Sequence, residues 1–122
     1  MDKKTIGKAS EDFACEYLKS INYTIIERNW SCGGGEIDII AKEGDELVFA
    51  EVRCKKKTSA IKPVDTITYR KQMRIQRAIE QYLFDNRLEV FARCDVISVL
   101  YEITENKALF KIDEHLKRVD LG

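Results

Sequence analysis

Two carboxylates lie inside apolar stretches where a buried strand would normally carry only hydrophobic side chains. Asp38 belongs to GGGEIDII, residues 33–40, and Glu51 belongs to LVFAEVRCKKK, residues 47–57. A desolvated charge without a partner costs on the order of several kcal/mol, so each acid needs a nearby cation or a proton. A divalent metal ion or an ion pair with a lysine or arginine would satisfy this need, and the sequence leaves both open.

The turn between the two stretches sets the geometry of the acids. EGDE, residues 43–46, predicts a β-hairpin with Gly44 and Asp45 as its two-residue loop. In that register Asp38 lies directly opposite Glu51. Because directly opposed carboxylates repel each other, the pairing strengthens the need for a cation.

The same register places other residues of the hairpin. Glu36 lies opposite Arg53, on the face that carries the acids. On the other face Ile37 pairs with Val52, and that face is wholly apolar. Arg53 can therefore help to neutralise the acids from within the hairpin.

Two helical side chains are further candidates for the acidic face. Glu16 falls on the border of the apolar stripe of a helix predicted for residues 4–21. Lys71 lies one helical turn from both Ile67 and Ile75, which places it on the sheet-facing side of a second helix. Glu16 can equally be a surface residue, and the Lys71 side chain can equally extend into solvent.

A strongly basic segment follows the second acidic strand. The chain has 21 basic and 21 acidic side chains, so its net charge is zero. Residues 53–77 nevertheless contain one acid, Asp65, and nine basic residues, a local net charge of +8. The basic residues are Arg53, Lys55, Lys56, Lys57, Lys62, Arg70, Lys71, Arg74 and Arg77. Such a local field attracts polyanions, although a solvated turn and helix face would have the same composition.

Periodicity predicts the elements that position these residues. A helix over 4–21 precedes strands over 23–30, 36–42 and 47–54, a helix from Pro63 to about residue 86, and strands over 91–101 and 108–113. Asp65 is the expected N-cap of the second helix. The long connection between the third and fourth strands favours a parallel, right-handed crossover. We therefore predict one α/β domain over residues 1–122, with a mixed central sheet flanked by helices.

Other features exclude several classes of protein. The four cysteines lack the paired spacing of a zinc or redox motif, so we expect free thiols. His115 is the only histidine, lies in the charged stretch DEHLKR, and is expected at the surface. No apolar run is long enough to cross a membrane, and the N-terminus lacks the apolar block of a signal peptide. We therefore expect a cytoplasmic protein without a membrane partner.

The acidic motifs resemble those of a known nuclease superfamily. GEIDII followed by LVFAEVR, with thirteen positions from Asp38 to Glu51, resembles the D…ExK core of the PD-(D/E)XK nucleases. The longer run NW…GGEIDIIA…LVFAEVR…YRKQMRIQRAIEQYL…RCDVISV is similar to the YraN-like family of small bacterial proteins, from the first helix to the fourth strand. The resemblance implies a restriction-endonuclease-like αβββαβ core, and that order matches the predicted elements.

The resemblance also implies roles for the acids. Asp38 and Glu51 would hold Mg²⁺ or Mn²⁺, and the backbone carbonyl of Val52 would be an additional ligand. Glu16 would correspond to the first-helix acid of resolvase-like members.

Arg53 departs from the superfamily motif, which has a lysine at this position. A lysine can orient or deprotonate an attacking water, whereas an arginine stays protonated and is better suited to clamp a phosphate. Lys71 would then supply the missing amine from the second helix. Arg93 and Asp95 of the fourth strand are candidates for the border of the site, and Asp95 can equally anchor a basic neighbour.

The expected activity is metal-assisted hydrolysis of a phosphodiester in DNA, including branched or structured DNA, or in RNA. The ion would lower the pKa of a bound water and stabilise charge on the phosphate. Five basic residues would hold the nucleic-acid backbone without reading its bases: Lys55, Lys56, Lys57, Arg70 and Arg74. Two alternatives stay open, namely a nucleic-acid-binding module that has lost turnover and a structural or partner-binding protein with an internal ion-pair network.

Overall fold

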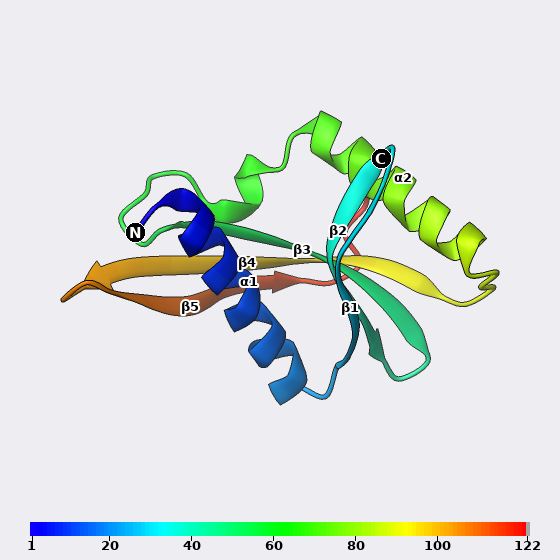
Figure 1. Ribbon diagram of the computed structural model, residues 1–122, viewed down its shortest axis with the longest axis horizontal. Coiled ribbons are helices and arrows are strands. Elements are labelled where there is room, and N and C mark those ends of the chain that lie inside the picture. Colours follow the sequence, from blue (N-terminus) through cyan, green and yellow to red (C-terminus); the bar gives the residue numbers. More distant parts are fainter. Residues whose placement is uncertain (122) are drawn as a thin grey trace.

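The chain forms a five-stranded sheet with two α-helices and one short 3₁₀ helix in the computed structural model, which describes residues 1–121 (Figure 1). The elements are α1 (Lys3–Ser20), β1 (Thr24–Cys32), β2 (Gly35–Glu43), β3 (Glu46–Lys56), the 3₁₀ helix η1 (Pro63–Thr66), α2 (Tyr69–Asp85), β4 (Ala92–Thr104) and β5 (Lys107–Leu116). The strands lie in the order β1-β2-β3-β4-β5, and only β3 and β4 are parallel. The predicted α/β fold with a mixed sheet is confirmed, and it is consistent with a restriction-endonuclease-like core.

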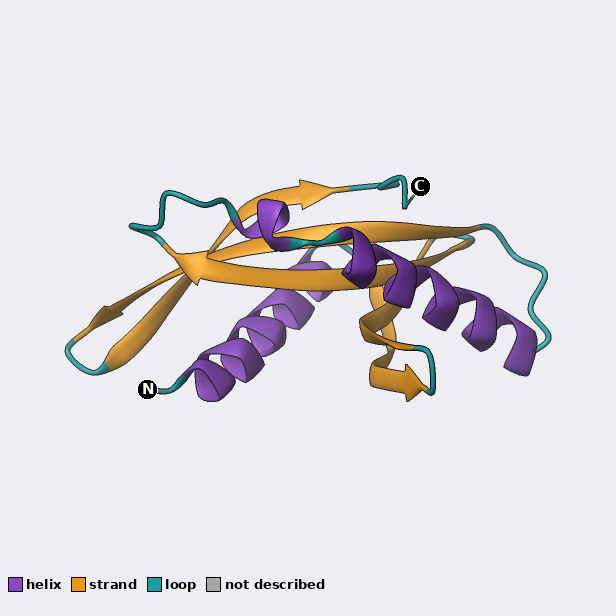
Figure 2. Cartoon of the chain, turned by 90° about the horizontal axis from the view of Figure 1, so that it is seen from above, coloured by secondary structure: helices purple, strands orange, loops and turns teal. Residues whose placement is uncertain are grey.

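Alternate residues of β3 point to the two helices, which therefore cover opposite faces of that strand. Val48 and Ala50 pack with Leu18 of α1 in one buried cluster. Phe49 packs with Ile75 of α2 in the other. The β4–β5 hairpin extends beyond α1 in both views of the molecule (Figures 1 and 2), so the two helices cover mainly the middle of the sheet.

The β2–β3 hairpin has the predicted two-residue turn. Gly44 has a φ of +58°, a backbone conformation that glycine adopts without strain. From the turn, the strands pair in the predicted register as far as Ile39 and Ala50. The ladder ends there, one pair short of the two acids.

Beyond that pair, β2 leaves β3 and follows α2. Ile37 packs in the buried cluster beneath α2 rather than opposite Val52, so this part of the predicted register is wrong. Gly35 supplies the physical reason, because a Cβ atom at this position would lie 1.9 Å from the backbone oxygen of Arg74. Only glycine allows the helix and the strand to approach this closely.

The helix α2 begins later than predicted. Pro63 begins η1 instead, and Ile67 is extended, with φ −83° and ψ 104°. Thr68 rather than Asp65 is the N-cap, because its hydroxyl accepts a hydrogen bond of 3.1 Å from the backbone N–H of Lys71. Proline is favoured at the start of a helical turn of either kind, so it could not distinguish a 3₁₀ helix from an α-helix.

The spacing of Ile6, Ala9, Phe13, Tyr17 and Ile21 predicts an apolar stripe on α1, but the buried face of the helix is rotated relative to this stripe. Ile6, Ser10, Ala14 and Leu18 are buried, whereas Ile21 is exposed and caps the C-terminal end of the helix. The prediction followed bulky side chains, but the small side chains at 10 and 14 allow the helix to lie close to the sheet. This rotation decides which acid of α1 faces the sheet.

Two expected exclusions can be compared directly with the structure. No helix within residues 1–121 is both long and apolar enough to cross a membrane. All four cysteines have free thiols, as predicted, and Cys15 and Cys94 are buried among apolar side chains.

Candidate functional site

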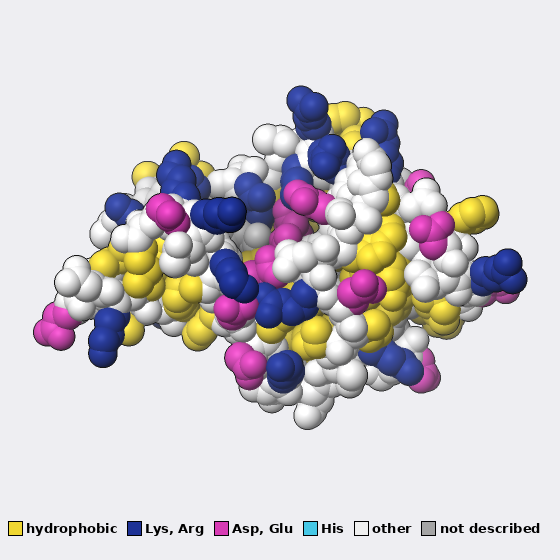
Figure 3. All heavy atoms as spheres, in the orientation of Figure 1, with side chains coloured by type: hydrophobic (Ala, Val, Ile, Leu, Met, Phe, Trp, Pro, Cys, Tyr) yellow, Lys and Arg dark blue, Asp and Glu magenta, His cyan; other side chains and the backbone are white. Residues whose placement is uncertain are grey.

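The acids Asp38 and Glu51 lie where β2 and β3 separate. The Asp38 Oδ2 atom accepts a hydrogen bond of 2.8 Å from the backbone N–H of Val52. The side chain of Asp38 thus satisfies a backbone donor of β3 beyond the end of the ladder. In this contact Val52 contributes its N–H group, and the ligand role of its carbonyl stays a prediction. Figure 3 shows acidic side chains in a hollow beneath the start of α2, with basic side chains around it.

Glu51 is almost fully buried, with 2% of its surface exposed. Burial and the neighbouring charge of Asp38 raise the pKa of Glu51 to about 9, against the opposing effects of Lys71 and Arg53. The Oε2 atom lies 3.5 Å from both Arg53 Nη1 and Lys71 Nζ. The Oε1 atom is buried and has no hydrogen-bond partner among residues 1–121. A bound cation would satisfy this oxygen, whose present environment is energetically unfavourable.

The 3₁₀ helix η1 fixes the guanidinium of Arg53. Arg53 Nε donates a hydrogen bond of 2.8 Å to the Thr66 hydroxyl, and Nη2 donates one of 3.3 Å to the Thr66 carbonyl. The Thr66 hydroxyl in turn donates to the carbonyl of Pro63 at 2.6 Å. Sequence reasoning missed Thr66, because nothing in its local pattern shows that η1 folds back onto β3.

Lys71 reaches the acids from the first turn of α2. Its Nζ atom lies 3.5 Å from Glu51 Oε2 and 3.2 Å from Glu36 Oε1. Glu36 therefore pairs with Lys71 and not with Arg53, the residue predicted to lie opposite it. The Lys71 ammonium therefore contacts both the buried carboxyl group of Glu51 and the exposed carboxylate of Glu36.

The acid that α1 presents to this region is Glu11 rather than Glu16. The Glu16 side chain is 74% exposed and pairs with Lys19 at 3.3 Å, so the expectation that it joins Asp38 is wrong. Glu11 and Asp38 line the same cavity, of about 410 Å³. Burial and the charge of Asp38 raise the pKa of Glu11, which also pairs with Arg28 at 3.1 Å. The rotated face of α1 causes this exchange, and the small side chains that produce it were the signal in the sequence.

Asp38 and Glu51 are the carboxylates that could hold a cation. Within residues 1–121, no group of three or more His, Cys, Asp and Glu side chains is arranged to hold a metal ion. Magnesium commonly binds through one or two carboxylates, with waters and substrate phosphates as its other ligands. The pair therefore suits a hard divalent cation that shares its ligands with a substrate, and not a closed zinc site.

The five predicted nucleic-acid-binding residues lie on either side of η1. They are Lys55 and Lys56 at the end of β3, Lys57 directly after it, and Arg70 and Arg74 in the first turns of α2. In the described part of the chain, none of their side chains forms an ion pair. Their positive charge is therefore not neutralised within the molecule.

Arg93 and Asp95 form a separate buried cluster with His115. Asp95 accepts hydrogen bonds from Arg93 Nε at 3.0 Å and lies 2.8 Å from His115 Nε2, and Tyr17 contacts the other ring nitrogen at 2.8 Å. Only 8% of the His115 side chain is exposed, so its predicted surface position is wrong. Burial alone would raise the pKa of Asp95. The hydrogen bonds from His115 and Arg93 outweigh burial and lower this pKa to about 2.

This cluster does not border the two acids. Asp95 pairs with Ala50, whose side chain faces α1, whereas Glu51 is the next residue of β3 and points to the opposite face. The sequence placed Arg93 and Asp95 on the correct strand but could not establish which face they occupy.

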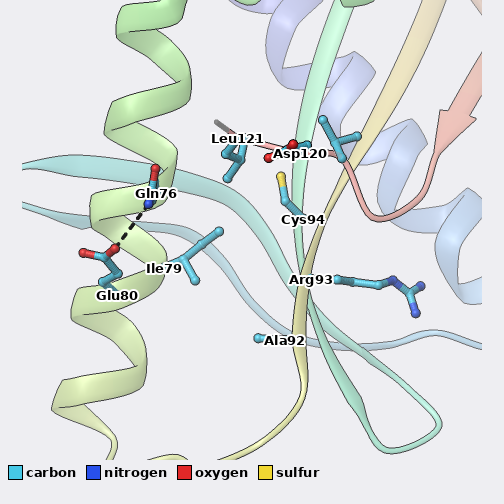
Figure 4. Close-up of a pocket in the computed structure, with 9 residues that line it drawn as sticks. Gln76, Ile79, Glu80, Ala92, Arg93, Cys94, Asp120 and Leu121 are labelled. Atoms are coloured by element: carbon cyan, nitrogen blue, oxygen red, sulfur yellow. Dashed lines mark hydrogen bonds between the residues drawn. The ribbon is translucent and has the colours of Figure 1, made fainter.

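A further cavity, of about 340 Å³, lies between α2, β4 and the C-terminal segment (Figure 4). Cys94 points towards it, whereas the Arg93 side chain extends away from it. Burial raises the pKa of the Cys94 thiol to about 12, so this thiol is not a reactive thiolate. The cavity contains neither of the two acids, and we do not assign the site to it.

The sequence is similar to bacterial proteins of one family. Residues 10–99 match the model described as "Uncharacterised protein family UPF0102". A UPF0102 protein of Dictyoglomus turgidum is 39% identical over 101 residues, which cover 82% of this chain and 86% of that protein. A UPF0102 protein of Geotalea daltonii is 41% identical over 100 residues, which cover 81% of this chain and 79% of that protein. A UPF0102 protein of Caldicellulosiruptor saccharolyticus is 36% identical over 110 residues, which cover 89% of this chain and 92% of that protein.

Proposed function

The chain belongs to the UPF0102 family, and we propose that it binds nucleic acid and hydrolyses phosphodiester bonds with a divalent metal ion, Mg²⁺ or Mn²⁺. The observation that carries this proposal is the buried Oε1 atom of Glu51, which has no hydrogen-bond partner in the described part of the chain, in a carboxyl group whose pKa is raised by the charge of a second carboxylate, Asp38. The resemblance to the PD-(D/E)XK nucleases, whose order of elements the chain shares, supports the same function.

Asp38 and Glu51 would hold the ion, which supplies an acidified water and stabilises negative charge on the phosphate. Arg53 would bind a phosphate oxygen, because its guanidinium is permanently charged and Thr66 holds it in one orientation. Lys71 would orient the attacking water, since its ammonium already lies beside Glu51.

The unpaired basic side chains would bind the nucleic-acid backbone. Lys55 and Arg53 line the same cavity together with Thr66 of η1, so a strand held by Lys55 would pass next to Arg53. Contacts of this kind attach to phosphates and carry no sequence information. We propose DNA rather than RNA as the main ligand.

A cleavage assay tests this function directly. Duplex DNA, single-stranded DNA, a four-way junction and RNA are each incubated with the protein and Mn²⁺ or Mg²⁺. We expect cleavage that EDTA abolishes and that Asp38→Asn and Glu51→Gln reduce at least about a hundredfold. Asp38→Asn retains an oxygen that can accept the Val52 N–H bond, so it removes the charge with little change in the fold.

The matched control is Asp45→Asn, which removes an exposed carboxylate from the turn of the same hairpin. This variant should cleave as the wild type does. Cleavage that survives EDTA, or that Asp38→Asn and Glu51→Gln leave unchanged, would contradict the proposal.

One observation favours a non-catalytic binding module as the second candidate. Glu51 Oε2 already lies 3.5 Å from two cationic groups, and one of them is the arginine that replaces the motif lysine. Such a module would bind DNA in EDTA and would cleave none of the four substrates with either metal.

A further inference from the structure

Tyr69, the first residue of α2, exposes a large aromatic ring to solvent. Its exposed fraction is 73%, and within residues 1–121 no ring contact, cation–π contact or side-chain hydrogen bond involves it. A single exposed apolar side chain is common on protein surfaces, so exposure alone does not indicate a function. The surroundings of Tyr69 are more informative.

The chain holds Tyr69 at the edge of the candidate site. Thr66, three residues earlier, binds Arg53, and Lys71, two residues later, contacts Glu51. Consecutive Cα atoms are about 3.8 Å apart, so the backbone of Tyr69 lies within about 8 Å of that of Lys71. At about 100° per residue, Tyr69 points away from the side that carries Lys71. The Tyr69 ring therefore does not contact Asp38 or Glu51 but lies on the outer side of α2.

The neighbours of the ring are basic. Arg70 follows Tyr69 directly, and Arg74 lies one helical turn after Arg70. Both arginines are exposed, and neither forms an ion pair with any residue that the structure describes. Figure 3 shows basic side chains over the start of α2. A polyanion bound by these arginines would pass near the exposed aromatic face of Tyr69.

We propose that Tyr69 stacks on an unpaired base of the bound nucleic acid, so that the preferred ligand has a single-stranded segment at the outer edge of the candidate site. Bases within a duplex are already stacked on both faces, and only an unpaired base offers a free face to a side chain. This inference rests on the proposed function, because the ring has a ligand only if the basic side chains hold nucleic acid.

Fluorescence anisotropy in EDTA tests the inference without hydrolysis. The probes are a short labelled DNA strand, the RNA strand of the same sequence, and the DNA duplex. Tyr69→Ala should weaken binding to both single strands about tenfold and change duplex binding less than about twofold. Tyr69→Phe should bind like the wild type, because stacking does not need the hydroxyl.

Two controls separate stacking from charge and from general exposure. Tyr69→Ala should leave the salt dependence of binding unchanged, whereas Arg74→Ala should reduce its slope by about one. Phe84→Ala removes a ring that is 79% exposed near the other end of α2 and should have no effect.

The outcomes distinguish the two proposals. Stacking is overturned, and the proposed function stands, if Tyr69→Ala binds single strands as tightly as the wild type does. The same conclusion follows if the substitution weakens single-strand binding and duplex binding by the same factor. If the wild type binds none of the three probes, both proposals are overturned.

Discussion

At the scale of the residue, Glu51 is placed where an ionised carboxylate is unfavourable. It is nearly fully buried, its Oε1 atom has no hydrogen-bond partner among the residues described, and the charge of Asp38 further disfavours ionisation. The raised pKa means that the folded protein binds a proton more tightly than the unfolded chain does. Stability therefore falls as the pH rises from the ordinary carboxyl range towards about 9. An acid with this property is expected where function, and not stability, requires it.

Glu51→Gln should therefore stabilise the metal-free protein. A neutral amide of similar size needs no proton to become neutral in the folded protein, and the cost of protonating Glu51 on folding grows as the pH rises above the ordinary carboxyl pKa. We therefore expect a gain on the order of 1–2 kcal/mol at about pH 8 and a smaller gain at about pH 5. Urea denaturation in EDTA at both pH values measures the change. A loss of stability at both would instead indicate that Glu51 serves mainly as the ion-pair partner of Arg53 and Lys71.

At the scale of the element, the site depends on the departure of β2 from β3. Residues from Ile39 towards the turn pair regularly, while Gly35 lies against the backbone of α2. Between them, Asp38 is left facing β3 and bonds to Val52. The close contact of α2 with Gly35 thus helps to determine where the acid points.

Gly35→Ala should disrupt this arrangement. The added Cβ would lie 1.9 Å from the Arg74 backbone oxygen, so α2 or β2 must move, and we expect a loss of about 2–4 kcal/mol in the free energy of unfolding. Gly33→Ala is the matched control, because a Cβ there has no heavy atom within 4 Å and the residue has no positive φ. Urea denaturation of both variants measures the difference, and equal stabilities would show that the contact is not restrictive.

At the scale of the whole molecule, a net charge of zero conceals an uneven distribution. Within residues 1–121, five basic side chains near η1 form no ion pair: Lys55, Lys56, Lys57, Arg70 and Arg74. In contrast, Arg93, Lys117 and Arg118 are paired with Glu43 and Glu46, which flank the β2–β3 turn. The local field, and not the total charge, governs attraction to a polyanion.

The triple variant Lys55→Ala/Lys56→Ala/Arg74→Ala should bind DNA more weakly and reduce the slope of log affinity against log salt by about three. The control removes three exposed lysines elsewhere, Lys42, Lys107 and Lys111, and changes the net charge by the same amount. Anisotropy titrations over a range of salt concentrations measure both slopes. Equal slopes in the two variants would mean that total charge, and not this surface, determines binding.

The fold could be predicted from sequence because it follows from local patterns. Alternation and the Gly44–Asp45 turn fixed the hairpin register as far as Ile39, and the long connection to β4 gave the parallel pair. The site was predicted less well, because its details depend on contacts between distant elements. Glu11 replaces Glu16 through the packing of α1, and Thr66 reaches Arg53 only because η1 folds back onto β3.

Calorimetric titration of Mn²⁺ into the wild type, Asp38→Asn and Asp45→Asn tests most directly whether the two acids form a cation site. We expect the wild type and Asp45→Asn to bind one ion each with similar affinity, and Asp38→Asn to show no binding heat. If the wild type binds no ion, or if Asp38→Asn binds as tightly as the wild type, Asp38 and Glu51 do not form a metal site.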